Sequence, residues 1–174
     1  MKKLRKNNRG FTLTELIVSA AILGIVALAA SAFMIAGTRA YSSVNYSVRL
    51  QYAAQIAMAQ LQEYTVDCTD GIAWDGSKLY IVNGNDVHLF KFDSQAETLS
   101  YAKTRKAETL DESTIPYNLA AEHIADMDVT LSNGQAEITL QMQRNNKTYS
   151  ATQVIAMRNR PVIEDSWADL EGKI

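Results

Sequence analysis

The feature of this sequence that most constrains its fold is an uncharged stretch that runs from Leu16 to Thr38. As an α-helix these 23 residues would be ~35 Å long, at about 1.5 Å per residue. The hydrocarbon core of a bilayer is about 30 Å thick, so a helix of this length can span it. The sequence therefore predicts a membrane-spanning helix close to the N-terminus.

Charged residues at the start of this stretch predict its orientation. The first ten residues contain no acid and five basic side chains, namely Lys2, Lys3, Arg5, Lys6 and Arg9. Because Lys and Arg beside a membrane segment stay cytoplasmic, residues 39–174 are expected outside. Glu15 lies just inside the apolar run, where a carboxylate is costly, so it is a candidate functional residue.

The segment Arg9-Gly10-Phe11-Thr12-Leu13-Thr14-Glu15-Leu16, with the apolar run behind it, resembles the N-terminus of type IV pilins and pseudopilins. In that family a basic leader ends in Gly, and prepilin peptidase cuts after it. The new first residue, usually Phe, is N-methylated, and the fifth mature residue is Glu. The resemblance covers about the first 30 residues. It implies a leader at residues 1–10, a processing site at Gly10 and Phe11, and an assembly role for Glu15.

The resemblance also implies how such a chain works. Glu15 would recruit and register a subunit by facing the Phe11 amine of a neighbour, since such a pair offsets the desolvation of both charges. The implied partners are prepilin peptidase, other pilin or pseudopilin subunits, an inner-membrane assembly platform and membrane lipid. The implied location is the bacterial cytoplasmic (inner) membrane, crossed once, and then a cell-surface or periplasmic filament. Such filaments serve type II secretion, twitching pili or DNA uptake.

One departure from the family pattern bears on the kind of subunit. Major pilins often carry a proline at the position of Ala32, and its absence predicts a less bent helix and favours a minor subunit. Two alternatives stay open. Ala30-Ser31-Ala32 fits an ordinary signal-peptidase site. In the second alternative, the chain is a membrane-anchored binding module or adhesin that never joins a filament.

The apolar pattern continues beyond the predicted membrane segment. Residues 39–64 contain no Gly or Pro, and apolar side chains recur there at helical spacing. They are Tyr41, Val44, Val48, Tyr52, Ile56 and Ala59. We expect one helix with an apolar, transmembrane half at residues 11–38 and an amphipathic half at 39–64. The recurring apolar face is predicted to pack on a sheet, because a soluble coiled coil would need stricter heptads.

Residues 65–160 are predicted to form an extracytoplasmic antiparallel sheet domain, which gives an α+β fold. Loop residues follow Tyr64, then strands are expected at 79–82, 87–92 and 98–103. Residues 104–118 are a long connection, and 118–125 a short helix or an irregular crossing. A meander follows, with turns at Ser132-Asn133-Gly134 and Asn145-Asn146. The acidic tail, residues 161–174, is expected to fray, or else to dock through Trp167, Leu170 and Ile174.

No residue set predicts catalysis, a cofactor or a metal site, so the chain is not expected to be an enzyme. His88 and His123 are far apart, and His88 is expected to face solvent. Cys68 is the sole cysteine and is expected to be inert. Asp67, Asp70 and Asp75 do not fit EF-hand spacing.

The charge balance bears on nucleic-acid binding. The full chain has a net charge of −2, and the first ten residues contribute five positive charges, so residues 11–174 carry −7. This acidic balance argues against direct nucleic-acid binding.

Overall fold

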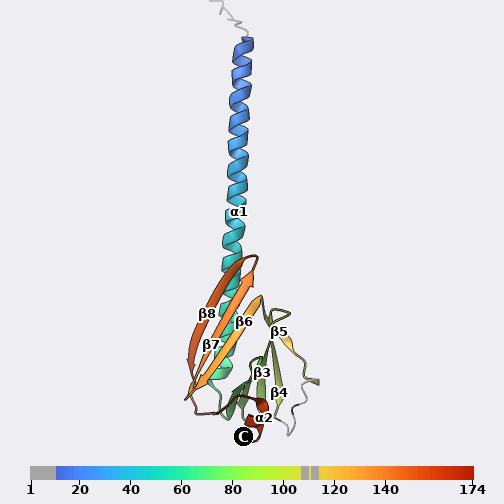
Figure 1. Ribbon diagram of the computed structural model, residues 1–174, viewed down its shortest axis with the longest axis vertical. Helices are drawn as coiled ribbons and strands as arrows, with labels where there is room; N and C mark the ends of the chain where they lie inside the picture. The colour runs from blue at the N-terminus through green and yellow to red at the C-terminus, as the bar shows by residue number, and fades with distance from the viewer. Residues whose placement is uncertain (1–10, 107–109, 111–113) are drawn as a thin grey trace, which may run out of the picture. The chain divides into compact units, whose positions relative to one another are not determined.

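The computed structural model describes residues 11–106, 110 and 114–174, so the predicted leader lies outside the described residues. The chain divides into two compact units, one up to Val44 and one from Asn45 to Ile174. Helix α1, Leu13–Val66, is 54 residues long and contributes to both (Figure 1).

The described part of the first unit is the N-terminal portion of α1, and its apolar side chains are exposed. An 18-residue window of this helix has a mean hydropathy of 2.5, and none of that window is buried. Three hydroxyl groups in it donate to the helix backbone: that of Ser19 to the carbonyl of Glu15, that of Ser31 to the carbonyl of Ala27, and that of Thr38 to the carbonyl of Met34. This helix is long and apolar enough to cross a membrane. In lipid, polar groups must find their hydrogen-bond partners within the protein, as these hydroxyl groups do.

In the second unit, α1 buries a different face from the one that the sequence pattern predicted. The buried side chains are Leu50, Ala54, Ala57, Met58, Leu61 and Thr65. The predicted face is exposed instead, including Val48 and Tyr52. The two faces are offset by two residues, which is about 200° around a helix of 3.6 residues per turn. The pattern misled because apolar residues occur on both faces, and the small Ala54 and Ala57 let the backbone approach the sheets.

The second unit contains two sheets, where the sequence predicted one. The first has the order β5-β4-β3-β2-β1-β9 and is antiparallel except for the parallel pair β1–β9. Its strands are β1 Gly71–Trp74, β2 Lys78–Asn83, β3 Asp86–Asp93, β4 Thr98–Arg105, β5 Asn118–Glu122 and β9 Val162–Glu164. The second is an antiparallel meander of β6 Ile124–Ser132, β7 Gln135–Arg144 and β8 Lys147–Ala156 (Figure 1). The predicted α+β class, a long N-terminal helix followed by mainly antiparallel strands, is confirmed.

Besides β9 in the C-terminal tail, two strands lie where the sequence did not predict them. Strand β1 falls where a loop was expected. Its four residues lie between turn-forming neighbours and are too few to show the alternating pattern that predicts a strand. Strand β5 falls where a short helix or a crossing was expected. Its Leu119-Ala120-Ala121 core has helical propensity, but pairing with β4 decides its conformation.

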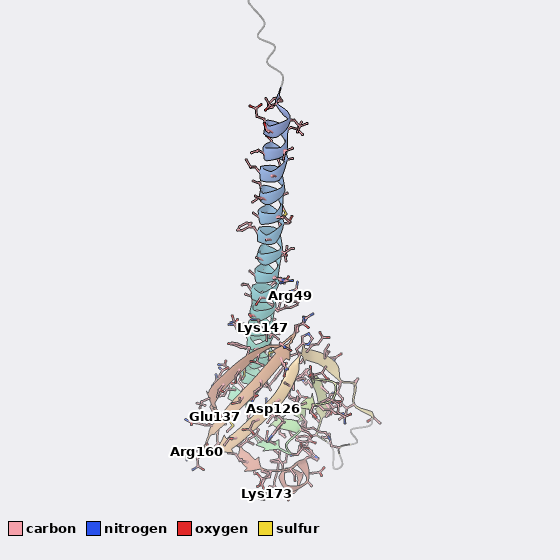
Figure 2. All side chains as sticks on the ribbon, turned by 45° about the horizontal axis from the view of Figure 1, so that its top comes forward. Arg49, Asp126, Glu137, Lys147, Arg160 and Lys173 are labelled. Atoms are coloured by element: carbon pink, nitrogen blue, oxygen red, sulfur yellow. The ribbon has the colours of Figure 1, made fainter. Side chains whose placement is uncertain are left out.

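The main core lies between α1 and the two sheets. In the meander, alternate residues of β7 face this core, namely Ala136, Ile138, Leu140 and Met142. The opposite face carries exposed acids such as Asp126 and Glu137 (Figure 2). Period-two burial of this kind is what a sheet with one covered face requires.

The C-terminal tail is ordered, so the prediction of a frayed end was wrong. Strand β9 pairs with β1, and helix α2, Trp167–Glu171, begins at Ser166, whose side chain caps the amide of Asp169. Leu170 is fully buried against the second face of the six-stranded sheet. Gly71 makes room for it, since a Cβ at Gly71 would collide with the Leu170 side chain. Burial of Leu170 supplies the free energy that an exposed acidic tail would lack.

Candidate processing and assembly site

The site begins with the cap of helix α1, which Thr12 and Glu15 form together. The Thr12 amide and hydroxyl both donate to Oε2 of Glu15, at 3.0 Å and 2.8 Å. In return, the Glu15 amide donates to the Thr12 hydroxyl at 3.3 Å. This reciprocal arrangement is a capping box, and it satisfies amides that the first turn of a helix otherwise leaves without partners.

Glu15 keeps one carboxylate oxygen available. Both Thr12 contacts end on Oε2, and Oε1 has no hydrogen-bond partner within the described part of the chain. The side chain is exposed beside a shallow hollow that Phe11, Thr14, Val18 and Ser19 also line. The partial positive charge at a helix N-terminus favours an anion at this position. The arrangement therefore presents an acceptor that an external cation or amine can approach.

Of the two predicted processing residues, Gly10 and Phe11, the structure describes only Phe11. Phe11 precedes the first turn of α1, and its side chain is 83% exposed. Gly10 lies outside the described residues. Cleavage between these two residues therefore stays a prediction.

Sequence reasoning missed the structural part played by Thr12. The signal was present, because Thr12-Leu13-Thr14-Glu15 is a Thr-x-x-Glu sequence directly before an apolar run, the usual signature of a capping box.

His88 contradicts the expectation that it faces solvent. It is 6% exposed, stacks on Tyr64 of α1 with ring centroids 4.3 Å apart, and has Nδ1 2.9 Å from the hydroxyl oxygen of Tyr101. Burial lowers the pKa of His88, and the nearby charge of Lys103 lowers it further. This cluster joins the end of α1 to strands β3 and β4. His123 lies elsewhere, between β5 and β6.

The loop acids have structural partners. Asp67 pairs with Arg158 at 2.9 Å, and Asp75 accepts from the amides of Ser77 and Lys78. Asp70 accepts from Thr69 and from the Gly84 amide, and these bonds lower its pKa. Within the described ranges, no cluster of three or more His, Cys, Asp or Glu side chains is placed to hold a metal.

A comparison with protein families connects this geometry to a known class. Residues 5–31 match the model of the prokaryotic N-terminal methylation motif. The chain thus carries the N-terminal signature of the type IV pilin family, which confirms the resemblance seen in the sequence. No match was found to a curated protein or to a solved structure. The motif marks a prepilin-type structural subunit, and the capped acid at Glu15 lies inside it.

Proposed function

We propose that this chain is a minor pilin-like or pseudopilin-like subunit of a filament for type IV pili, type II secretion or DNA uptake. Prepilin peptidase cuts between Gly10 and Phe11, and the Phe11 amine is then methylated. Residues 11–38 hold the chain in the cytoplasmic membrane in a single pass, with the sheet domain and the tail 161–174 outside. The inner-membrane platform then moves the subunit into a filament.

The observation that carries this proposal is the coincidence of three features. The methylation motif ends in an apolar helix whose described side chains are exposed, Phe11 is 83% exposed, and Oε1 of Glu15 has no hydrogen-bond partner among the described residues. A carboxylate in a membrane is penalised unless a cation meets it. The Phe11 amine of a neighbouring subunit is a cation that cleavage itself creates. Helix α1 also runs unbroken through Ala32, in keeping with a minor subunit.

Glu15 variants test this proposal by separating the cap from the charge. Glu15→Gln keeps the size and the hydrogen-bond acceptor that a capping box accepts, but removes the negative charge. Glu15→Val removes both. We expect both variants to be cut and to stay in the membrane, yet to enter sheared filaments far less than the unaltered chain. The measurement compares membrane content and filament content in the same cells.

The Gln variant decides between the two roles of Glu15. If Glu15→Gln assembled normally while Glu15→Val did not, the acid would serve only as a helix cap. If the unaltered chain stayed in the membrane and never entered filaments, the binding-module alternative would replace this proposal.

A further inference from the structure

Strand β8 forms an open edge of the three-stranded meander. It pairs with β7 along all of its ten residues without a shift in register, and within the described residues no strand pairs with its other side. It contains no proline, and its only charged residue is Lys147 at its start, which is labelled in Figure 2. A long, regular edge of this kind offers unpaired N–H and C=O groups that a further strand can join.

The other three edges of the two described sheets carry features that oppose the addition of a strand. Strand β9 has three residues and β5 has five, and the pairing of β5 with β4 shifts between Leu99 and Ser100. Strand β6 has a similar shift near its start and carries the exposed Asp126 and Asp128. Short strands, bulges and charges are the usual protection of sheet edges, and β8 has none of them after Lys147.

The register of the β7–β8 hairpin shows which backbone groups of β8 face the open edge. The Met157 amide donates to the Gly134 carbonyl at 2.8 Å, just beyond the end of the ladder. Hydrogen-bonded pairs alternate in an antiparallel ladder, so the residues of β8 that bond to β7 are Tyr149, Ala151, Gln153 and Ile155. The residues between them turn their N–H and C=O groups away from β7, and their side chains are exposed: Thr148, Ser150, Thr152, Val154 and Ala156.

This row of backbone groups specifies the kind of molecule that can cover it. Donors and acceptors recur every second residue, about 6.7 Å apart along the strand, and an extended polypeptide presents the same repeat. The occupant is therefore a β-strand, which gains its main-chain hydrogen bonds from the edge and its selectivity from the side chains beside it.

The side chains beside the open edge favour an uncharged strand. From Thr148 to Ala156 the strand carries no charge. On the side that faces α1, Gln153 donates to the amide oxygen of Gln62 at 2.7 Å, and the exposed Gln55 lies about two turns earlier on the same flank of the helix. A charged side chain that was buried among these amide and hydroxyl groups would lose its hydration without gaining an opposite charge.

A second copy of this chain does not fit the edge in the usual antiparallel mode. Two identical strands that pair in this way are related by a twofold axis perpendicular to the sheet. That axis reverses every direction in the plane of the sheet, including the direction of the α1 residues packed on its inner face. The helices of the two copies would then run in opposite directions, which chains anchored in one membrane with one orientation cannot do.

We propose that the open edge of β8 receives an extended, uncharged segment of a different extracytoplasmic polypeptide, which joins the meander as a further strand. The inference goes beyond filament assembly. It rests only on the part of the proposed function that places the second unit outside the membrane.

The first test blocks the edge without touching the β7 ladder. Ser150→Pro removes an N–H that points to the open edge, and edge strands tolerate proline at such positions, whereas Ser150→Ala keeps that N–H. The probe is a fluorescent, end-blocked peptide that copies residues 148–155, because this sequence is uncharged and already forms a strand in the protein. We expect the full chain in detergent to bind it, with affinity about tenfold or more lower in Ser150→Pro and little changed in Ser150→Ala. Equal affinities in the two variants would overturn the inference.

The second test needs no substitution and locates the bound peptide. Amide hydrogen exchange of the unaltered chain is followed by NMR with and without the peptide. We expect the amides of Ser150 and Thr152 to exchange about tenfold more slowly with the peptide, and those of Tyr149 and Ala151 to change little because they already bond to β7. No binding up to ~1 mM peptide, or binding without slower exchange at Ser150 and Thr152, would overturn the inference.

The third test asks whether a second copy occupies the edge. Cys68 is buried, so Ser150→Cys supplies one accessible thiol at the open edge. We expect no disulfide-linked dimer of this variant in membranes under mild oxidation. Such a dimer would identify the occupant as a second copy and overturn the inference.

These tests fail separately from those of the proposed function. Peptide binding, amide exchange and cross-linking at Ser150 do not require a filament. If the chain forms no filaments, the edge proposal stands or falls on its own measurements.

Discussion

Glu15 combines two roles within one carboxylate. Oε2 closes the first turn of α1 through Thr12, and Oε1 points to no group among the described residues. The cap fixes the direction of the side chain before any partner arrives. A partner amine then meets an acceptor whose geometry is already set, so less side-chain entropy is lost on contact. This division explains why an acid at this position is compatible with a stable helix start.

At His88, stability should depend on pH. The folded-state pKa is lowered by burial, so the unfolded chain binds the proton more readily. The stability that neutral His88 provides is fully present above its unfolded pKa of about 6.5 and is lost as pH falls through the folded pKa. We expect the urea midpoint of the detergent-solubilised chain to fall between pH 7.5 and pH 5.5, and to fall less in His88→Phe, which keeps a ring beside Tyr64.

Other titrating groups face His88 and must be controlled. Tyr64 and Glu63 of α1, Asp86 of β3, and Tyr101 and Lys103 of β4 surround it or act on its charge. Asp86 has a lowered pKa because Lys103 binds it, so it titrates in more acidic solution than this window. His123→Phe serves as the matched control. If the pH dependence of the urea midpoint disappeared in His123→Phe and persisted in His88→Phe, the effect would belong to His123, and the prediction for His88 would be wrong.

Among the elements, the C-terminal segment closes the second face of the six-stranded sheet. Leu170 has no exposed surface and packs with Tyr80, Val82 and Leu89. We expect Leu170→Ala to lower the free energy of unfolding by about 2–5 kcal/mol, as for other buried leucines. Chemical denaturation measures it, with the exposed Val154→Ala as control. Equal midpoints for both variants would mean that the tail contributes nothing to the fold.

Elements whose conformation is local could be predicted from the sequence, and those that depend on distant contacts could not. The predicted turn at Gly134 has positive φ, as does the one at Asn145-Asn146, and these residue types tolerate that conformation wherever they occur. Strand β5 and the buried face of α1 depend on which sheet lies beside them, and propensity does not specify that. The motif residues of the site were predicted for the same local reason, whereas the burial of His88 against Tyr64 needed the tertiary fold.

The molecule as a whole is predicted to divide between membrane and water. Between Glu15 and Glu63 the chain has no acid and only Arg39 and Arg49 as basic residues. We expect the chain to stay in the membrane pellet after carbonate washing, and external protease to digest the sheet domain in spheroplasts. Release into the wash without cleavage would contradict anchorage by residues 16–38, and protection from protease would contradict the orientation.

The central claim is that this chain is a processed prepilin-like subunit, and the mass and N-terminal sequence of the mature protein test it most directly. The account predicts a chain that begins at Phe11 with a methylated amine, and loss of this shortened form in Gly10→Val, because a side chain there would obstruct the close approach of the peptidase. A mature chain that begins at Phe33 would show ordinary signal-peptidase cleavage after Ala32. That result, or an uncut chain in cells that make prepilin peptidase, would contradict the account.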